Sequence, residues 1–120
     1  MPASYEIDVV ERVVTTCFWG VVTDDEVSEH DKRLRSDPNF NRAYRQLVDM
    51  SGITKPAVTS RMIFEAALDH FFEPGSRRAI VATDDAVFGL ARMYALHSER
   101  VGQTIEVYRE RAPAEEWLNR

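Results

Sequence analysis

The stretch that decides the fold is RQLVDMSGITKPAVTSRMIFEAALDHFF, residues 45–72. Its first part carries an apolar run around Leu47, Val48 and Met50, which predicts a short buried strand. A polar turn follows, and the apolar segment 61–72 then predicts a helix. Because free N–H groups at a helix N-terminus favour anions, we expect a ligand or a regulatory phosphate at this strand–turn–helix junction.

A predicted β-hairpin and a capped helix precede this stretch. Residues 5–9 alternate between apolar and polar side chains, and residues 13–19 are rich in β-branched and aromatic ones, so both segments are typical of strands. Thr23-Asp24-Asp25-Glu26 matches a capping box, which predicts that a helix begins there. Asp37-Pro38 is expected to end that helix.

Two further strand–helix pairs are predicted after the central stretch. Residues 77–82 form an apolar run of the kind that is buried on both faces, and Thr83-Asp84-Asp85 is expected to cap a helix after it. Residues 103–108 alternate again, and a last short helix begins near Pro113. The order is β-β-α-β-α-β-α-β-α, which predicts one α/β domain over residues 1–120. Right-handed crossovers would make its five-stranded sheet mixed, with the hairpin as the antiparallel edge and about four helices packed on it.

Composition limits the classes of function. The net charge of −5 argues against nucleic acid as a partner, because phosphate binding needs a basic surface. The single cysteine, Cys17, excludes an internal disulfide and a cysteine-rich metal site. No apolar run approaches the roughly 20 residues of a membrane span, and no basic-then-apolar signal peptide opens the chain. We therefore expect a cytoplasmic protein.

Five segments together carry a resemblance to a known fold family. They are DPNF (37–40), LVDMSGI (47–53), AIVA (79–82), VFGLARM (87–93) and AEEWL (114–118). In their order and spacing, the chain resembles the STAS, or anti-sigma-factor antagonist, fold, and is most similar to its SpoIIAA-like branch. That branch shares a superfamily-level fold with the SEC14/CRAL-TRIO lipid-binding domains.

The resemblance implies a small binding or regulatory domain without an established reaction. In the anti-anti-sigma relatives, a partner kinase phosphorylates a serine of an Asp-Ser-Ser-Gly motif at the mouth of the helix after the central strand. The corresponding place here reads Ala-Val-Thr-Ser, residues 57–60. Hydroxyl groups are present, but the motif itself is not.

Polar residues at the predicted strand ends and helix mouths have two open interpretations. Thr59 and Ser60, with Thr54 upstream, accept a phosphate or hold an anion, or they cap the helix, which we favour. Asp49 beside Ser51 orients a ligand at the sheet edge, or bonds the backbone of its own turn, which we favour. For Thr83 and Asp84 we favour stabilisation of the helix end over a ligand site.

Large aromatic side chains and arginines form the remaining candidates. Phe64, Phe71, Phe72 and Phe88 supply core packing, a homodimer face or an apolar ligand pocket, and core packing accounts for most of them. An anion site could be lined by arginines, although solvated edge positions are their commoner fate. These arginines are Arg61, Arg77, Arg78 and Arg92.

No catalytic or metal-binding constellation is recognisable in the sequence. His30, His70 and His97 lie on different predicted helices without ligand spacing, and neither a glycine-rich phosphate loop nor a nucleophile elbow is present. No cofactor is implied. We therefore predict a non-enzymatic regulatory module that binds a partner protein and forms a homodimer. The alternative is a carrier or sensor of a small apolar or anionic ligand, held between the second and third helices.

Overall fold

The computed structural model describes residues 2–69 and 71–120, and it confirms the predicted order of strands and helices. The capping box is formed: the Thr23 side chain accepts from the Glu26 N–H, and the Glu26 carboxylate accepts from the Thr23 N–H. The elements are β1 (Ala3–Asp8), β2 (Val13–Thr23), α1 (Asp24–Ser36), β3 (Arg45–Ala57), α2 (Ser60–Ala67), β4 (Arg77–Val81), α3 (Asp85–Glu99), β5 (Thr104–Tyr108) and α4 (Arg111–Leu118).

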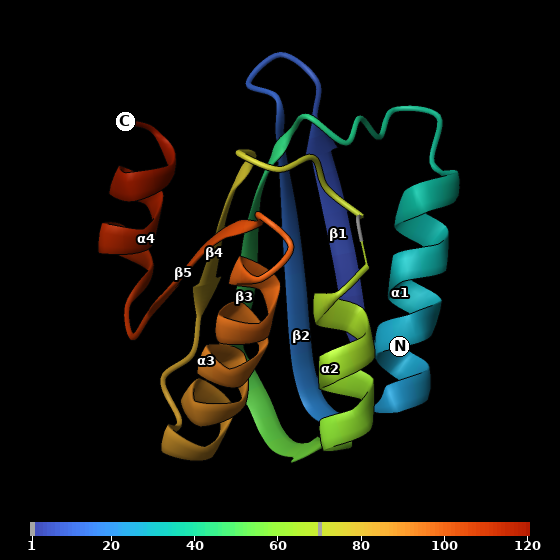
Figure 1. The fold of residues 1–120 in the computed structure, drawn as a ribbon, viewed down its shortest axis with the longest axis vertical. Coiled ribbons are helices and arrows are strands. Elements are labelled where there is room, and N and C mark those ends of the chain that lie inside the picture. The colour runs from blue at the N-terminus through green and yellow to red at the C-terminus, as the bar shows by residue number, and fades with distance from the viewer. Residues whose placement is uncertain (1, 70) are drawn as a thin grey trace.

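The five strands form one mixed sheet in the order β1-β2-β3-β4-β5 (Figure 1). β1 pairs antiparallel with β2, and the other neighbours pair in parallel, as predicted from the crossover rule. Successive parallel strands are neighbours in the sheet, and their crossover connections are right-handed. The connecting helices α1, α2 and α3 therefore lie on the same face of the sheet. α4 packs on β3, β4 and β5 from the other face.

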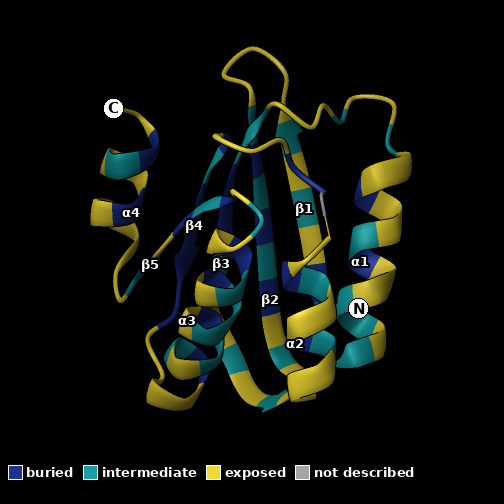
Figure 2. Ribbon diagram, in the orientation of Figure 1, coloured by how far each residue is buried: buried dark blue, intermediate teal, exposed yellow. Residues whose placement is uncertain are grey.

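Most residues of β4 are buried (Figure 2). The alternation of side chains along β3 and β4 divides the core between the two faces of the sheet. Val48 and Ile80 belong to the cluster beneath α3. Leu47 and Ala79 belong to the cluster on the opposite face, where they are buried together with Leu118 of α4. Strands buried on both faces explain why the central segments of the sequence are nearly continuous apolar runs.

The central strand is longer than predicted, and this corrects the expected polar turn at residues 51–60. β3 continues through Thr54 to Ala57 because the equally extended β2 pairs with it as far as Thr23↔Ala57. Beyond Asp49, none of the described residues pairs with β3 on its β4 side. Pro56 is tolerated there because a strand edge without a neighbour needs no N–H donor.

The helix expected over residues 61–72 ends earlier, at Ala67. Phe71 and Phe72 follow it and turn into the core beside Val14 and Leu34. Both phenylalanines are buried together because they lie outside the helix, where neighbouring side chains would have diverged. His70 lies outside the described residues.

No helix within the described part of the chain has the length and apolar character required to cross a lipid bilayer.

Candidate functional site

A cavity of about 140 Å³ lies between the sheet and the three helices that cover one of its faces. Its walls come from β2, β3 and β4 below and from α1, α2 and α3 above, and they are mostly apolar. The lining residues are Phe18, Val22, Val27, His30, Asp31, Arg35, Gln46, Val48, Met50, Ile53, Pro56, Val58, Met62, Ile63, Ala66, Asp69, Phe71, Arg78, Ile80, Val87, Leu90, Ala91 and Tyr94.

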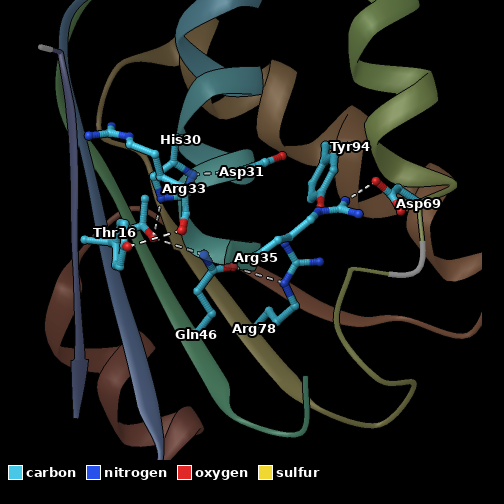
Figure 3. Close-up of polar contacts among 10 residues, drawn as sticks. Thr16, His30, Asp31, Arg33, Arg35, Gln46, Asp69, Arg78 and Tyr94 are labelled. Atoms are coloured by element: carbon cyan, nitrogen blue, oxygen red, sulfur yellow. Dashed lines mark hydrogen bonds and ion pairs between the residues drawn. The ribbon is translucent and has the colours of Figure 1, made fainter. Parts of the chain in front are cut away.

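A chain of polar side chains crosses the sheet wall of this cavity (Figure 3). Arg78 Nε donates to Gln46 Oε1 at 3.1 Å, and Gln46 Nε2 donates to Thr16 Oγ1 at 3.1 Å. Thr16 Oγ1 lies 3.1 Å from His30 Nε2, and His30 Nδ1 lies 3.0 Å from Asp31 Oδ1. Three strands and α1 are therefore joined through one buried network.

Both ring nitrogens of His30 have hydrogen-bond partners in the network. A carboxylate oxygen of Asp31 only accepts, so His30 Nδ1 carries the proton and donates it. Thr16 accepts from Gln46, and its Oγ1 is also within hydrogen-bond distance of His30 Nε2. Both ring nitrogens are thus engaged within the protein.

Arg78 is the most unusual member of this network. It is only 7% exposed, although arginine is almost never fully buried unless paired. Its guanidinium lies over the Phe72 ring at 4.5 Å and near the Tyr94 ring at 5.6 Å. Nη2 donates to the Tyr94 hydroxyl at 2.9 Å. No carboxylate within residues 2–69 or 71–120 forms an ion pair with it.

A second arginine lies at the solvent-exposed end of the cavity lining. Arg35 of α1 forms an ion pair with Asp69, just after α2, and its guanidinium lies 4.2 Å from the centre of the Phe71 ring. Both charged side chains are more than two-fifths exposed. An exposed pair of this kind contributes little to stability, so it can open without a large cost.

The structure makes Thr59 a helix cap, the interpretation favoured from sequence. Its hydroxyl accepts from the Met62 N–H at 3.1 Å and donates to Asp24 Oδ2 at 2.9 Å. A phosphate at this oxygen would face the Asp24 carboxylate, and like charges repel. Ser60 is exposed at the first position of α2, and Thr54 is exposed within β3. None of the three lines the cavity.

We expect Thr59→Ala to lower the free energy of unfolding by about 1 kcal/mol, because the cap of α2 is lost. Ser60→Ala is the matched control, since it removes a neighbouring exposed hydroxyl, and should stay within about 0.5 kcal/mol of the wild type. Urea unfolding followed by circular dichroism measures both. Equal losses for the two variants would show that Thr59 does not cap the helix.

Asp49 bonds its own turn, as favoured from sequence. Its Oδ1 accepts from the Ser51 N–H at 2.9 Å and from the Ser51 hydroxyl at 2.6 Å. Oδ2 forms an ion pair with Arg111 at 3.3 Å. Burial raises the pKa of the nearby Cys17 thiol, and the Asp49 charge raises it further. Cys17 therefore stays protonated and is a poor nucleophile near neutral pH.

Asp84 caps α3, with Oδ2 accepting from the N–H groups of Ala86 and Val87 at 3.0 and 3.2 Å. Thr83 is exposed, and its carbonyl accepts from Arg109 at 3.2 Å. Asp84 therefore stabilises the start of the helix, which is the interpretation favoured from sequence. Neither lines the cavity between the sheet and α1–α3.

The four candidate phenylalanines lie in different environments in the structure. Phe71 lines the cavity, and Phe72 is fully buried beneath the Arg78 guanidinium. Phe88 is half-buried under Arg109, whose guanidinium lies 4.0 Å from its ring centre. Phe64 is 42% exposed on α2. Phe71 and Phe72 are therefore unavailable to a second chain as the structure stands.

The sequence indicates Arg78 as a candidate for an anion site but not its partners in the polar wall of the cavity. The favoured interpretation of Arg78, a solvated edge position, is wrong because β4 lies between β3 and β5 and Arg78 is buried. The signal that could have shown this burial is an arginine within a segment predicted to be buried on both faces. Gln46 adjoins Arg78 through the β3–β4 register, which no local pattern in the sequence encodes.

Within the described ranges, no cluster of three or more His, Cys, Asp or Glu side chains is arranged to hold a metal ion. A ligand in the cavity would contact apolar walls, one hydrogen-bond network and the buried Arg78 guanidinium.

The sheet order, the helices on its two faces and this element sequence define an α/β protein with a SpoIIAA-like fold. A solved structure with that fold is an uncharacterized protein from the DUF3478 family of Shewanella loihica PV-4. It is similar to this chain with a TM-score of 0.65 and 14% sequence identity, over 97% of this chain and 93% of that one. No protein-family model and no curated protein matches the sequence. The predicted SpoIIAA-like fold is confirmed, and at this identity the likeness concerns the fold alone.

Proposed function

We propose that this protein is a non-catalytic regulatory module that binds a small, largely apolar ligand between its sheet and helices α1–α3. The observation that carries the proposal is the cavity of about 140 Å³. It is close in volume to an engineered cavity of about 150 Å³ that binds benzene. Ordinary protein interiors contain few voids larger than a water molecule, because they are close-packed.

The burial of the Thr16–His30 pair supports a binding role rather than a catalytic one. His30 Nε2 faces the Thr16 hydroxyl, and Nδ1 faces Asp31. Thr16 is 0% exposed and does not line the cavity, so a substrate there would not reach its hydroxyl. The imidazole therefore holds the wall of the cavity in place. Arg78, which stays protonated in proteins, supplies charge without supplying a base.

A protein partner or a second copy of the chain would meet exposed apolar side chains on α2 and α3. Phe64 is 42% exposed and Leu96 is 56% exposed, and the Phe64 ring lies 5.2 Å from the His97 ring of α3. These helices also roof the cavity. A ligand beneath them would therefore change the surface that a partner contacts. We propose that ligand binding regulates the affinity for the partner in this way.

Isothermal titration with benzyl alcohol tests the proposal. We expect saturable binding to the wild type, with a dissociation constant of about 1 mM or tighter, since a compact apolar fragment gains up to about 1.5 kcal/mol per heavy atom. Ala66→Leu should abolish the binding without loss of stability, because Ala66 lines the cavity and the larger side chain fills it.

Ala86→Leu is the matched control, since Ala86 is an exposed helical alanine of α3 that does not line the cavity. This variant should bind benzyl alcohol like the wild type. Binding that survives Ala66→Leu, or no binding to the wild type, would contradict the proposed function.

A further inference from the structure

We infer that the ligand is a compact apolar monocarboxylate, and that Arg78 receives its carboxylate while the apolar cavity receives its body. This inference rests on the proposed function and specifies the chemistry of the ligand. It starts from Arg78, which lines the cavity, is only 7% exposed and always carries its charge.

The hydrogen-bond inventory of Arg78 is incomplete. A guanidinium has five N–H donors in a planar fork, and two of them are used, by Gln46 and by the Tyr94 hydroxyl. The other three have no acceptor within residues 2–69 and 71–120. A carboxylate accepts two parallel N–H bonds from such a fork, which is the strongest pairing that arginine makes.

The other charged side chains of the lining already have partners. Asp31 accepts from His30, and Asp69 forms an ion pair with Arg35. Of the two arginines in the described lining, Arg35 has a carboxylate partner and Arg78 has none. A buried charge is costly unless it is paired, so an anion is the ligand group that this wall favours.

The network also holds the guanidinium in place for such a ligand. Gln46 fixes its Nε edge, and the Phe72 ring lies against one face at 4.5 Å. Thr16 and His30 in turn hold the Gln46 amide. A pre-oriented donor loses little entropy on binding, which raises affinity. The cavity volume limits the apolar body to roughly the size of a benzene ring.

The test compares benzoate with benzyl alcohol, which has nearly the same apolar body without the charge, by isothermal titration to the protein. We expect the wild type to bind benzoate at least about 10-fold more tightly than benzyl alcohol. This factor corresponds to the free energy of a charge-assisted hydrogen bond. Arg78→Met should remove this preference, so that benzoate and benzyl alcohol bind the variant with affinities within about 3-fold of each other.

Gln46→Glu provides a second variant that does not depend on the tolerance of the fold for Met at position 78. It places a carboxylate beside Arg78 from within the protein, so it should also abolish the benzoate preference. Arg92→Met is the matched control, because Arg92 is exposed on α3 and does not line the cavity; it should bind both compounds like the wild type.

Three outcomes are distinguishable. A benzoate preference that Arg78→Met and Gln46→Glu both lose, and Arg92→Met keeps, supports the inference. Equal binding of benzoate and benzyl alcohol to the wild type overturns the inference and leaves the proposed function standing. Binding of neither compound overturns both.

Discussion

Replacing Phe72 with Ala should lower the free energy of unfolding by about 3–5 kcal/mol, the usual cost of removing a fully buried aromatic ring. Phe72 is 0% exposed. Its ring packs against Phe40 and Phe71, with centroids 5.4 and 5.0 Å away, and supports the Arg78 guanidinium from below. The change would therefore leave a hole and also remove a cation–π partner from a buried charge.

Phe88→Ala is the control for this comparison. Phe88 is half-buried, and its main partner is the exposed Arg109 guanidinium, so its removal should cost only about 1 kcal/mol. Urea unfolding of both variants, analysed by linear extrapolation, measures the difference. Similar losses for the two phenylalanines would contradict the assignment of Phe72 to the core.

Gln46→Leu should lower the free energy of unfolding by about 3 kcal/mol, because the apolar side chain leaves buried polar groups unpaired. Gln46 is 3% exposed, and it joins Arg78 to Thr16 through its two amide atoms. Without it, the Arg78 Nε–H loses its acceptor in a region that water does not reach easily.

Gln46→Glu separates the loss of the hydrogen bond from the loss of the side chain's shape. Glutamate has the same length and still accepts from Arg78, so this variant should lose less stability than Gln46→Leu at neutral pH. Chemical unfolding of the two variants under identical conditions gives the comparison. A larger loss for Gln46→Glu would show that the N–H donated to Thr16, which glutamate lacks, contributes more than the acceptor for Arg78.

The order of elements could be predicted from sequence because its signals are local. The capping box at Thr23 and the capping aspartate Asp84 mark two helix starts, and side-chain alternation marks the outer strands. The limits of the central elements could not be predicted. Gly52 and Pro56 are typical of a turn, yet pairing with the long β2 keeps both within β3, since tertiary contacts override local preference.

The candidate site was predictable only in outline. The expected ligand space between α2 and α3 corresponds to part of the cavity roof. On the opposite wall, Gln46 and Arg78 line the cavity, and Thr16 lies behind them. These residues come from three strands and meet only through the sheet register. Such a network is a non-local feature, because a residue's neighbours across a sheet depend on pairing rather than on spacing along the chain.

Methyl-resolved NMR of the protein titrated with benzyl alcohol tests the central claim most directly, because it shows where the ligand lies as well as whether it binds. The account predicts saturable shifts for methyl groups of Val48, Met62 and Ile80, which line the cavity. Shifts confined to the exposed Leu68 and Leu96, or no saturable shifts at any methyl group, would contradict it.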